Sequence, residues 1–260
     1  MKSANVDKAA YHQSALEQAR EKDLLRLFEI LPKGMGAALE IGARDGYYTR
    51  ILTGFFESVA ALDLERPDFQ IDRVKTVRGD VTQLHFPDDF FDCVVATEVL
   101  EHVPEIERAC HEISRVSKKY VIIGVPYRQD IRVGRTTCLS CGRISPPWGH
   151  INAFWEGQLR SYFSEFEVVE SSFVGENRDR TNRISAWLMD LGGNPRGTYN
   201  QKEACVNCGA KLVAPRHRST LRRMSSGLAH RINRIQSLFT RPCPNWIHIL
   251  FRKNSGRPTD

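Results

Sequence analysis

Two short stretches of the chain carry the same arrangement of cysteines: residues 138–142 read C-L-S-C-G and residues 205–209 read C-V-N-C-G. Each stretch can present two thiolates from a tight turn that the glycine eases, and four thiolates form the tetrahedral site that structural zinc prefers. We therefore expect one structural Zn²⁺ to be bound by Cys138, Cys141, Cys205 and Cys208. A redox pair is disfavoured because Thr136–Ser145 lacks the helical pattern that usually follows a reactive C-x-x-C. The alternative is two unrelated pairs of loop cysteines.

Polar and glycine residues follow several of the short apolar runs. The first run leads into a glycine turn, E-I-G-A-R-D-G-Y at Glu40–Tyr47, which can bring the backbone close to a ligand at the C-terminal edge of a strand. The second run ends in Asp63, a carboxylate placed to accept hydrogen bonds from ribose hydroxyls. The next two runs are followed by G-D-V at Gly79–Val81 and by E-V-L-E-H-V-P at Glu98–Pro104.

Hydrophobic periodicity predicts the elements that position these motifs. A helix is expected over about Asp7–Leu31, where apolar residues share a face and Pro32 follows. Short apolar runs then alternate with helical patterns, which predicts a mostly parallel sheet with helices on both faces. The expected strands are Ala37–Gly42, Ser58–Asp63, Arg73–Arg78, Phe91–Thr97, Tyr120–Val125, Phe166–Val174 and Trp246–Arg252, and the expected helices between them are Gly46–Phe55, Pro104–Ser117 and Trp155–Phe163. Residues 127–150 and 175–244 are expected to be irregular, apart from a basic helical pattern in the second segment.

The order of the strand-end motifs resembles that of class I S-adenosylmethionine-dependent methyltransferases of the type 11 and type 23 kind, over about residues 34–173 and the final strand. The resemblance implies a cofactor site lined by Glu40, Gly42, Ala43 and Gly46 at the methionine end, Asp63 at the ribose, Asp80 and Val81 beside the adenine, and Glu98. Arg44 departs from the family, which usually has glycine there. A nicotinamide enzyme is disfavoured because G-A-R-D-G lacks the G-x-G-x-x-G needed for a pyrophosphate.

The same resemblance implies an α/β fold with a Rossmann-like, seven-stranded sheet whose last strand is antiparallel and lies beside the fifth. The expected domains are an N-terminal helical segment at 1–33 and a methyltransferase core at 34–174 plus 245–253. Insertions at 127–150 and 175–244 are expected to form a zinc-stapled, basic cap. With an antiparallel last strand, both insertions emerge at the C-terminal edge of the sheet, where cofactor and substrate bind in such folds.

Candidate groups for the chemistry follow the fourth strand and lie in the first insertion. The sulfonium of the cofactor already activates the methyl group, so the main task is alignment of a nucleophile, and an oxygen or nitrogen nucleophile also needs a base. The candidates are His102, His150 and Glu101. Together with Glu98, they resemble the metal-binding quartet of small-RNA 3′-end 2′-O-methyltransferases, which implies Mg²⁺ or Mn²⁺. The alternative is that Glu101 and His102 only cap the next helix and pack its loop.

The positive charge of the chain is concentrated near its end. Lys211–Asp260 contains 11 Lys or Arg and one acid, which gives this segment a charge of +10. Because the net charge of the whole chain is +6, the preceding 210 residues carry −4. Within residues 216–241, one helical stripe comprises Leu221, Met224, Leu228, Ile232, Ile235 and Phe239. The stripe predicts a helix that packs on the body and leaves its basic face in solvent. Otherwise, that face meets an anionic surface, a phosphate-bearing ligand or RNA.

The chain begins without an apolar, signal-like run, and no apolar stretch approaches the ~20 residues of a membrane span. A cytoplasmic location with reduced thiols is therefore expected. The expected activity is methyl transfer to a small-molecule or carbohydrate-type acceptor, on oxygen. One alternative is a metal-dependent RNA 2′-O-methyltransferase. The other is a non-catalytic, cofactor-binding regulatory or scaffold protein.

Overall fold

The computed structural model describes residues 14–199, 201–215 and 219–254, and the chain divides into two compact units. The sheet unit comprises the described residues within Met1–Tyr127, Trp155–Gly175 and Pro244–Asp260. The insert unit comprises those within Arg128–Phe154 and Glu176–Cys243. Each unit is considered by itself below. The part of the expected first helix that precedes residue 14 lies outside the described residues.

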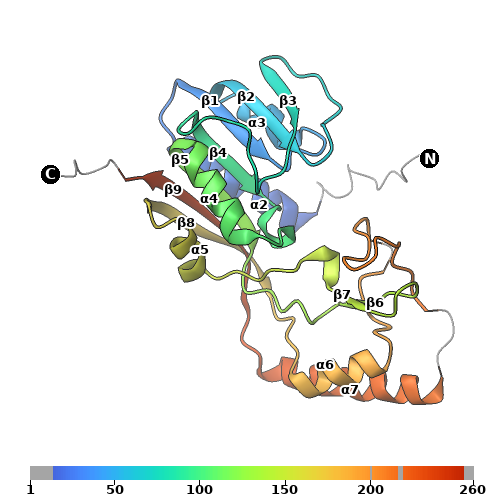
Figure 1. Ribbon diagram of the computed structural model, residues 1–260. Helices are drawn as coiled ribbons and strands as arrows, with labels where there is room; N and C mark the ends of the chain where they lie inside the picture. Colours follow the sequence, from blue (N-terminus) through green and yellow to red (C-terminus); the bar gives the residue numbers. More distant parts are fainter. Residues whose placement is uncertain (1–13, 200, 216–218, 255–260) are drawn as a thin grey trace. The chain divides into compact units, whose positions relative to one another are not determined.

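Seven strands form the main sheet: β1 Met35–Ile41, β2 Phe56–Asp63, β3 Val74–Arg78, β4 Phe91–Thr97, β5 Ser117–Pro126, β8 Phe166–Asn177 and β9 Cys243–Lys253. Their order is β3-β2-β1-β4-β5-β9-β8 (Figure 1). The pairs from β3 through β5 are parallel, and β9 is antiparallel to β5. The predicted seven-stranded sheet, with an antiparallel last strand beside the fifth, is confirmed.

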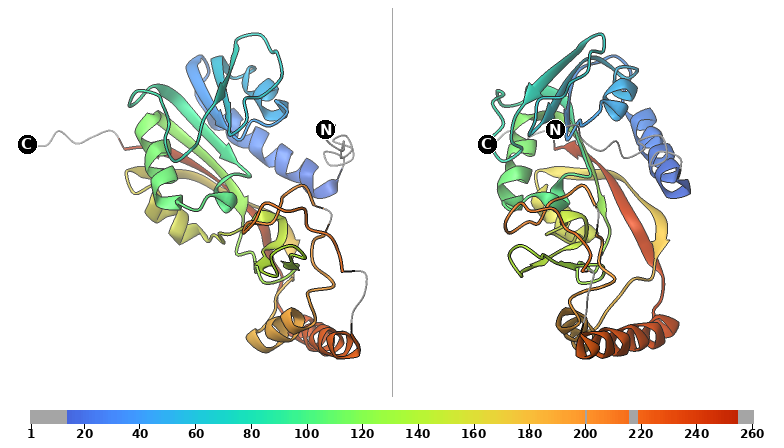
Figure 2. Two further views of the ribbon diagram at one scale, coloured as in Figure 1. Left: turned by 45° about the vertical axis from the view of Figure 1, so that its right-hand side comes forward. Right: turned by 90° about the vertical axis from the view of Figure 1, so that its right-hand side faces the viewer.

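The helices of the sheet unit are α2 Ala15–Ile30, α3 Tyr47–Leu52, α4 Ile106–Val116 and α5 Glu156–Tyr162, and a short 3₁₀ helix, η1, spans Leu100–His102. Helices α2 and α3 cover one face of the sheet, and α4 and α5 cover the other (Figure 2). Because both faces are covered, β4 and β5 consist largely of buried apolar residues and do not alternate with polar ones. Leu24, Leu27 and Phe28 of α2 are buried in the core against β1 and β2.

Helix α2 is fixed to β9 by two polar contacts. The buried ring of His248 lies with its Nδ1 2.7 Å from Oδ2 of Asp23, and the hydroxyl of Ser172 on β8 donates to the same carboxylate. One turn earlier, the guanidinium of Arg20 lies over the ring of Trp246, 3.7 Å from its centroid. These contacts determine where α2 presents Arg20.

The insert unit contains more regular structure than the sequence predicts. Thr136–Thr137 (β6) and Ile144–Ser145 (β7) pair as a short antiparallel hairpin, followed by the 3₁₀ helix η2 at Pro147–Gly149. Helix α6 spans Arg183–Leu191, and α7 spans Thr220–Phe239. No helix within residues 14–199, 201–215 and 219–254 combines the length and the apolar character that a bilayer crossing requires.

The expected packing face of the basic helix is wrong. Helices α6 and α7 lie side by side (Figure 2) and approach through small residues, with Ser185 Oγ donating to the carbonyl of Ala229 at 2.8 Å. A Cβ atom on Gly192 would lie 2.7 Å from the Cβ of Ser226, which shows how closely the end of α6 approaches α7 there. Most of the predicted apolar stripe points to solvent instead, and Leu221 is 77% exposed. Side-chain size, and not hydrophobic periodicity, selects the contact face of α7.

We expect acid to destabilise the fold through the Asp23–His248 pair. Burial lowers the pKa of His248 below its ordinary 6.5 and Arg20 acts in the same direction, although Asp23 and Glu98 raise it. The unfolded chain therefore binds the histidine proton more readily, so the free energy of unfolding falls as the pH drops below about 6.5. The urea midpoint should be lower at a pH of about 5.5 than at about 7.5. The His248→Asn variant, whose amide nitrogen takes the place of Nδ1 and can still donate to Asp23, should lose less; equal losses in both proteins would contradict this expectation.

Candidate active site

The turn after β1 is held against the end of β2. The backbone N–H groups of Gly42 and Ala43 donate to the carbonyl of Leu62, at 2.8 and 3.1 Å. The N–H of Arg44 donates to Oδ2 of Asp63 at 3.0 Å, and the N–H of Leu64 donates to Oδ1 of the same carboxylate. Gly42 and Gly46 have φ of +82° and +78°, a backbone region that favours glycine. Both glycines of the expected turn thus have a left-handed backbone, and the turn lies beside Asp63.

Glu40 is the buried acid of this turn. It accepts a hydrogen bond from the hydroxyl of Thr49 on α3. Burial raises the pKa of Glu40 to about 8, opposed by the Thr49 hydrogen bond and assisted by the negative charges of Asp45 and Asp63. A carboxyl group of this kind is poised to ionise when a positive charge comes near.

The turn after β3 continues the same edge of the sheet. The N–H of Gly79 donates to the carbonyl of Asp63 at 2.9 Å, which ties the ends of β3 and β2 together. Oδ1 of Asp80 accepts from the N–H and the hydroxyl of Thr82, both at 2.8 Å, while Val81 is buried. The edge therefore offers one fixed carboxylate and one apolar surface side by side in the chain.

Glu98, which follows β4, is held by two arginines. Arg20 of α2 forms an ion pair with one of its carboxylate oxygens, and Arg44 Nη1 lies 3.7 Å from the other. Its backbone is unusual, with φ of +60°, and its N–H donates to the carbonyl of Gly124 at 3.0 Å. Arg20 was not anticipated from the sequence, because nothing in the pattern of α2 distinguishes a site residue from a surface arginine.

The three candidate catalytic residues belong to different units. Glu101 and His102 lie in η1 of the sheet unit, and His150 follows η2 in the insert unit. Glu101 is fully buried, and its Oε2 has no hydrogen-bond partner among the described residues. Burial raises the pKa of Glu101 to about 8, opposed by its own backbone hydrogen bond and assisted by Glu98. His150 Nδ1 lies 2.7 Å from Oε1 of Gln129.

The four predicted cysteines come together in the insert unit, with their sulfur atoms within 4.8 Å of one another. Cys138 Sγ lies 3.7 Å from Cys208 Sγ, and Cys141 Sγ lies 3.8 Å from Cys205 Sγ. Four sulfurs bonded to one zinc ion at about 2.3 Å stand about 3.8 Å apart. The separations are thus those of a tetrahedral zinc–thiolate site.

The two cysteine turns are built alike. The N–H of Cys138 donates to the carbonyl of Arg143, and that of Cys205 to Ala210, both at 2.9 Å. The glycine that closes each turn donates back to the first cysteine's carbonyl, at 2.9 and 2.8 Å, with φ of +70° and +71°. One hydrogen-bond pattern repeated 67 positions along the chain is what the paired C-x-x-C-G motif predicts.

The four neighbouring thiols of the cluster can all ionise only if a cation compensates their charge. Burial opposes ionisation of Cys205, yet the backbone amides of Asn207 and Cys208 lower the pKa of this thiol to about 6. At Cys208, the amide of Ala210 lowers the pKa, but the neighbouring sulfurs, Cys141 first, raise it to about 12. Four sulfurs this close cannot all ionise alone, and a bound divalent metal removes that obstacle.

Comparisons with known proteins show a matching domain and a shared fold. A family profile described as "Methyltransferase domain" matches residues 39–123. The chain also shares its fold with the YcgJ protein of Bacillus subtilis (13% identity, TM-score 0.56, 91% of this chain and 100% of that one). A similar likeness holds for the N-methyltransferase NodS of Bradyrhizobium japonicum, solved with S-adenosyl-L-homocysteine (14% identity, TM-score 0.54, 97% and 94% covered). Residues 39–123 thus match a methyltransferase domain, and the chain has the fold of these solved structures.

Curated relatives match within a limited stretch. The sterol 24-C-methyltransferases of Aspergillus fumigatus and Neurospora crassa are 32% and 34% identical to this chain in alignments of 100 positions that cover 34% of this chain. The chain spans 26% of the length of these relatives. The similarity therefore supports the methyltransferase domain and leaves the acceptor undefined.

The edge at Gly42–Gly46 and Asp63 offers groups that suit S-adenosylmethionine, the cofactor that the methyltransferase match implies. Each carboxylate oxygen of Asp63 accepts one backbone N–H and keeps lone-pair capacity for a ribose hydroxyl. The left-handed turn at Gly42–Gly46 brings backbone to the same edge, and buried Val81 offers an apolar contact for a base. Asp63 and Val81 thus offer an acceptor for ribose hydroxyls and an apolar contact for a base.

We expect Asp63→Asn to weaken binding of S-adenosyl-L-homocysteine about 10- to 100-fold, because an amide nitrogen cannot accept the hydrogen bonds that the lost oxygen accepts. Isothermal titration calorimetry measures the effect. Asp72→Asn is the matched control, since its carboxylate is 98% exposed and the same charge is removed. Thermal melts of both variants separate loss of binding from loss of fold. Equal affinity of the Asp63→Asn variant and the wild type would contradict the assignment.

Proposed function

We propose that the chain transfers the methyl group of S-adenosylmethionine to an oxygen of a small-molecule or carbohydrate-type acceptor. The observation that carries the proposal is the edge formed by the Gly42–Gly46 turn and Asp63 within the methyltransferase domain. By their names, proteins of similar sequence or fold act on carbon and on nitrogen. What they share with this chain is therefore the cofactor half, and the acceptor has to be found by experiment.

In this proposal the bound cofactor supplies an electrophilic methyl group on a sulfonium. Asp63 accepts hydrogen bonds from the ribose hydroxyls, while Asp80 and Val81 border the adenine. Glu40, Gly42, Ala43 and Gly46 border the methionine end, where ionised Glu40 favours a cationic ligand. Glu98, held by Arg20 and Arg44, shapes the same site. His102, His150 and Glu101 are the proposed groups for accepting the proton of the acceptor hydroxyl.

The insert unit is proposed to act as a cap on the cofactor edge, stapled by a structural zinc ion. Four thiolates would fill the coordination sphere of zinc and leave no position for a water nucleophile, which assigns the metal to folding and not to chemistry. Support comes from the sulfur–sulfur separations of 3.7 and 3.8 Å. A cytoplasmic location, where thiols stay reduced, belongs to the same proposal.

Purified protein should contain about one zinc ion per chain, because four thiolates at tetrahedral spacing bind zinc tightly. Cys205→Ser should lose the metal and lower the melting temperature, since metal binding stabilises the fold that forms the site. Inductively coupled plasma mass spectrometry measures the content. Cys243→Ser is the control, because Cys243 lies outside the cluster. Zinc-free wild-type protein would overturn the zinc assignment.

RNA 2′-O-methylation with Mg²⁺ or Mn²⁺ remains the second candidate. It is favoured by one observation, the buried and unpartnered Oε2 of Glu101, which is a ready metal ligand. It is disfavoured by Glu98, whose two oxygens are already engaged by Arg20 and Arg44. A metal that used Glu98 would have to displace both guanidinium groups.

Transfer of labelled methyl groups separates the two activities. We expect label from S-adenosylmethionine to enter a low-molecular-weight fraction of a metabolite extract without added Mn²⁺, and Asp63→Asn, but not Asp72→Asn, to reduce this transfer at least about tenfold. Label entering short RNA, dependent on Mn²⁺ and lost in His150→Ala with zinc retained, would favour the RNA activity instead. Cofactor binding with no transfer to either pool would favour the non-catalytic alternative.

A further inference from the structure

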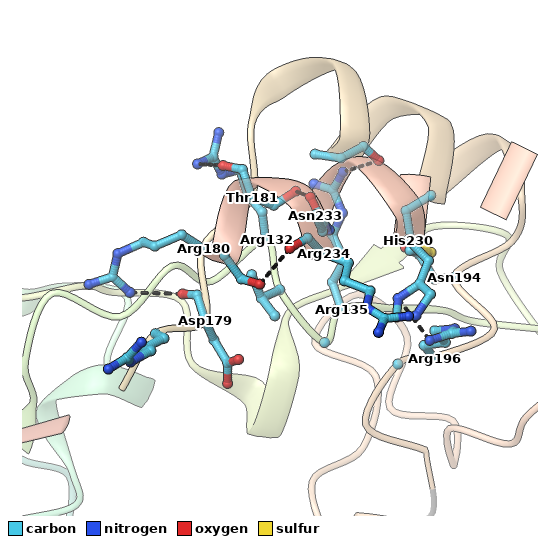
Figure 3. A pocket seen from close by; sticks show the side chains of 17 residues that line it. Arg132, Arg135, Asp179, Arg180, Thr181, Asn194, Arg196, His230, Asn233 and Arg234 are labelled. Atoms are coloured by element: carbon cyan, nitrogen blue, oxygen red, sulfur yellow. Dashed lines mark hydrogen bonds between the residues drawn. The ribbon is translucent and has the colours of Figure 1, made fainter. Parts of the chain in front are cut away.

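One pocket lies wholly within the insert unit. It has a volume of about 320 Å³, at the lower end of the range for small-molecule sites. Four segments line it: residues 132–135, residues 178–181, helix α6 together with residues 194–197 that follow it, and helix α7 (Figure 3). These segments are distant in sequence, so the pocket is a product of the fold and was not visible as a motif.

Six of the 17 lining residues are arginines, against a single acid, Asp179. Arg132 and Arg135 are neutralised from outside the pocket, by Asp130 and Asp190. The other four are Arg178, Arg180, Arg196 and Arg234, and no carboxylate among the described residues lies within 4.0 Å of their guanidinium nitrogens. The pocket thus holds a surplus of positive charge that the described chain leaves uncompensated.

Some of these guanidinium groups are positioned by neutral partners. Arg180 Nη2 donates to Cys243 Sγ at 2.7 Å, and its Nη1 donates to the carbonyl of Asp179 at 2.8 Å. Arg196 Nη1 lies 2.8 Å from Nδ1 of His230 on α7 (Figure 3). Neutral acceptors orient a guanidinium without cancelling its charge, so each group keeps N–H donors for an anion.

A separate observation also indicates a ligand. Arg135 and Asn194 line this pocket, and Nε of Arg135 and Oδ1 of Asn194 are both buried without a hydrogen-bond partner among the described residues. A buried N–H donor without a hydrogen bond is costly even where the guanidinium charge is paired, so native structures seldom keep one. A ligand that reached these atoms with an acceptor oxygen and a hydroxyl group would satisfy both.

We propose that this pocket binds a phosphate-bearing ligand. Phosphoryl oxygens are the acceptors that several forked guanidinium groups hold best, and a volume of about 320 Å³ admits more than a single phosphate, which favours a diphosphate or a phosphate ester. The site does not depend on the proposed methyl transfer, because every lining residue lies in the insert unit. The phosphoryl group belongs either to a soluble metabolite or to a lipid headgroup.

Pyrophosphate binding to the full-length protein tests the site, with inorganic phosphate as a smaller probe. Because each guanidinium supplies charge-assisted hydrogen bonds, we expect Arg234→Gln and Arg180→Gln each to weaken pyrophosphate binding about tenfold. Arg231→Gln is the matched control: Arg231 is an exposed arginine of α7 that does not line the pocket, and its loss should change the affinity less than about twofold. Titration calorimetry at constant ionic strength measures all four proteins, and thermal melts confirm that each is folded.

Two results would overturn the proposal. One is the absence of binding of either probe to the folded wild-type protein. The other is an equal loss of affinity in Arg231→Gln and Arg234→Gln, since general attraction to a basic surface, and not a pocket, would then explain binding.

Vesicle sedimentation distinguishes the two sources of the phosphoryl group. Phosphatidylcholine vesicles with and without phosphatidic acid are compared. Sedimentation that requires phosphatidic acid and is lost in Arg234→Gln, or in excess pyrophosphate, supports a lipid headgroup in the pocket. Pyrophosphate binding without sedimentation supports a soluble ligand. Sedimentation unchanged in Arg234→Gln but lost when the exposed Phe239 of α7 is changed to Ser would overturn the pocket as the lipid site.

Discussion

The antiparallel pairing of β9 with β5 is the constraint on which the rest of the structure depends. The register aligns Pro126 with Trp246, and the N–H of Tyr127 donates to the carbonyl of Asn245 at 2.9 Å. The chain therefore re-enters the sheet where β5 leaves it. Two insertions distant in sequence start and finish at this one edge, which allows two separate C-x-x-C-G turns to meet. The same strand carries His248, which anchors α2 and so delivers Arg20 to Glu98.

The fold and the cysteine cluster were predictable because each rests on short-range chemistry. The apolar strands are buried on both faces, so their sequence shows them as continuous runs. Asp63 follows such a run directly, and the glycine turn has a local reason in its left-handed φ at Gly42 and Gly46. The C-x-x-C-G motif is sufficient to predict the backbone hydrogen bonds of each cysteine turn. Only the approach of the two C-x-x-C-G turns to each other depends on topology, and it follows from the antiparallel last strand.

What the sequence did not reveal depends on contacts between distant segments of ordinary composition. Helix α6 was missed because it packs through Ser185 and Ala186, while Ile184 and Trp187 face solvent, the reverse of the pattern that marks a buried helix. The packing face of α7 was misjudged for the same reason. Arg20 and the arginines of the insert-unit pocket look like surface residues in the sequence. Their function depends on which side chains the fold places next to them, and the sequence pattern does not show this.

The central claim is that the edge formed by the Gly42–Gly46 turn and Asp63 binds S-adenosylmethionine. A crystal structure of the protein grown with S-adenosyl-L-homocysteine tests it most directly. The account predicts ribose hydroxyls within hydrogen-bond distance of the Asp63 carboxylate, the adenine against Val81 and the amino-acid tail beside Glu40. Density for the ligand at another place in the protein, with Asp63 holding only the backbone N–H groups of Arg44 and Leu64, would contradict it.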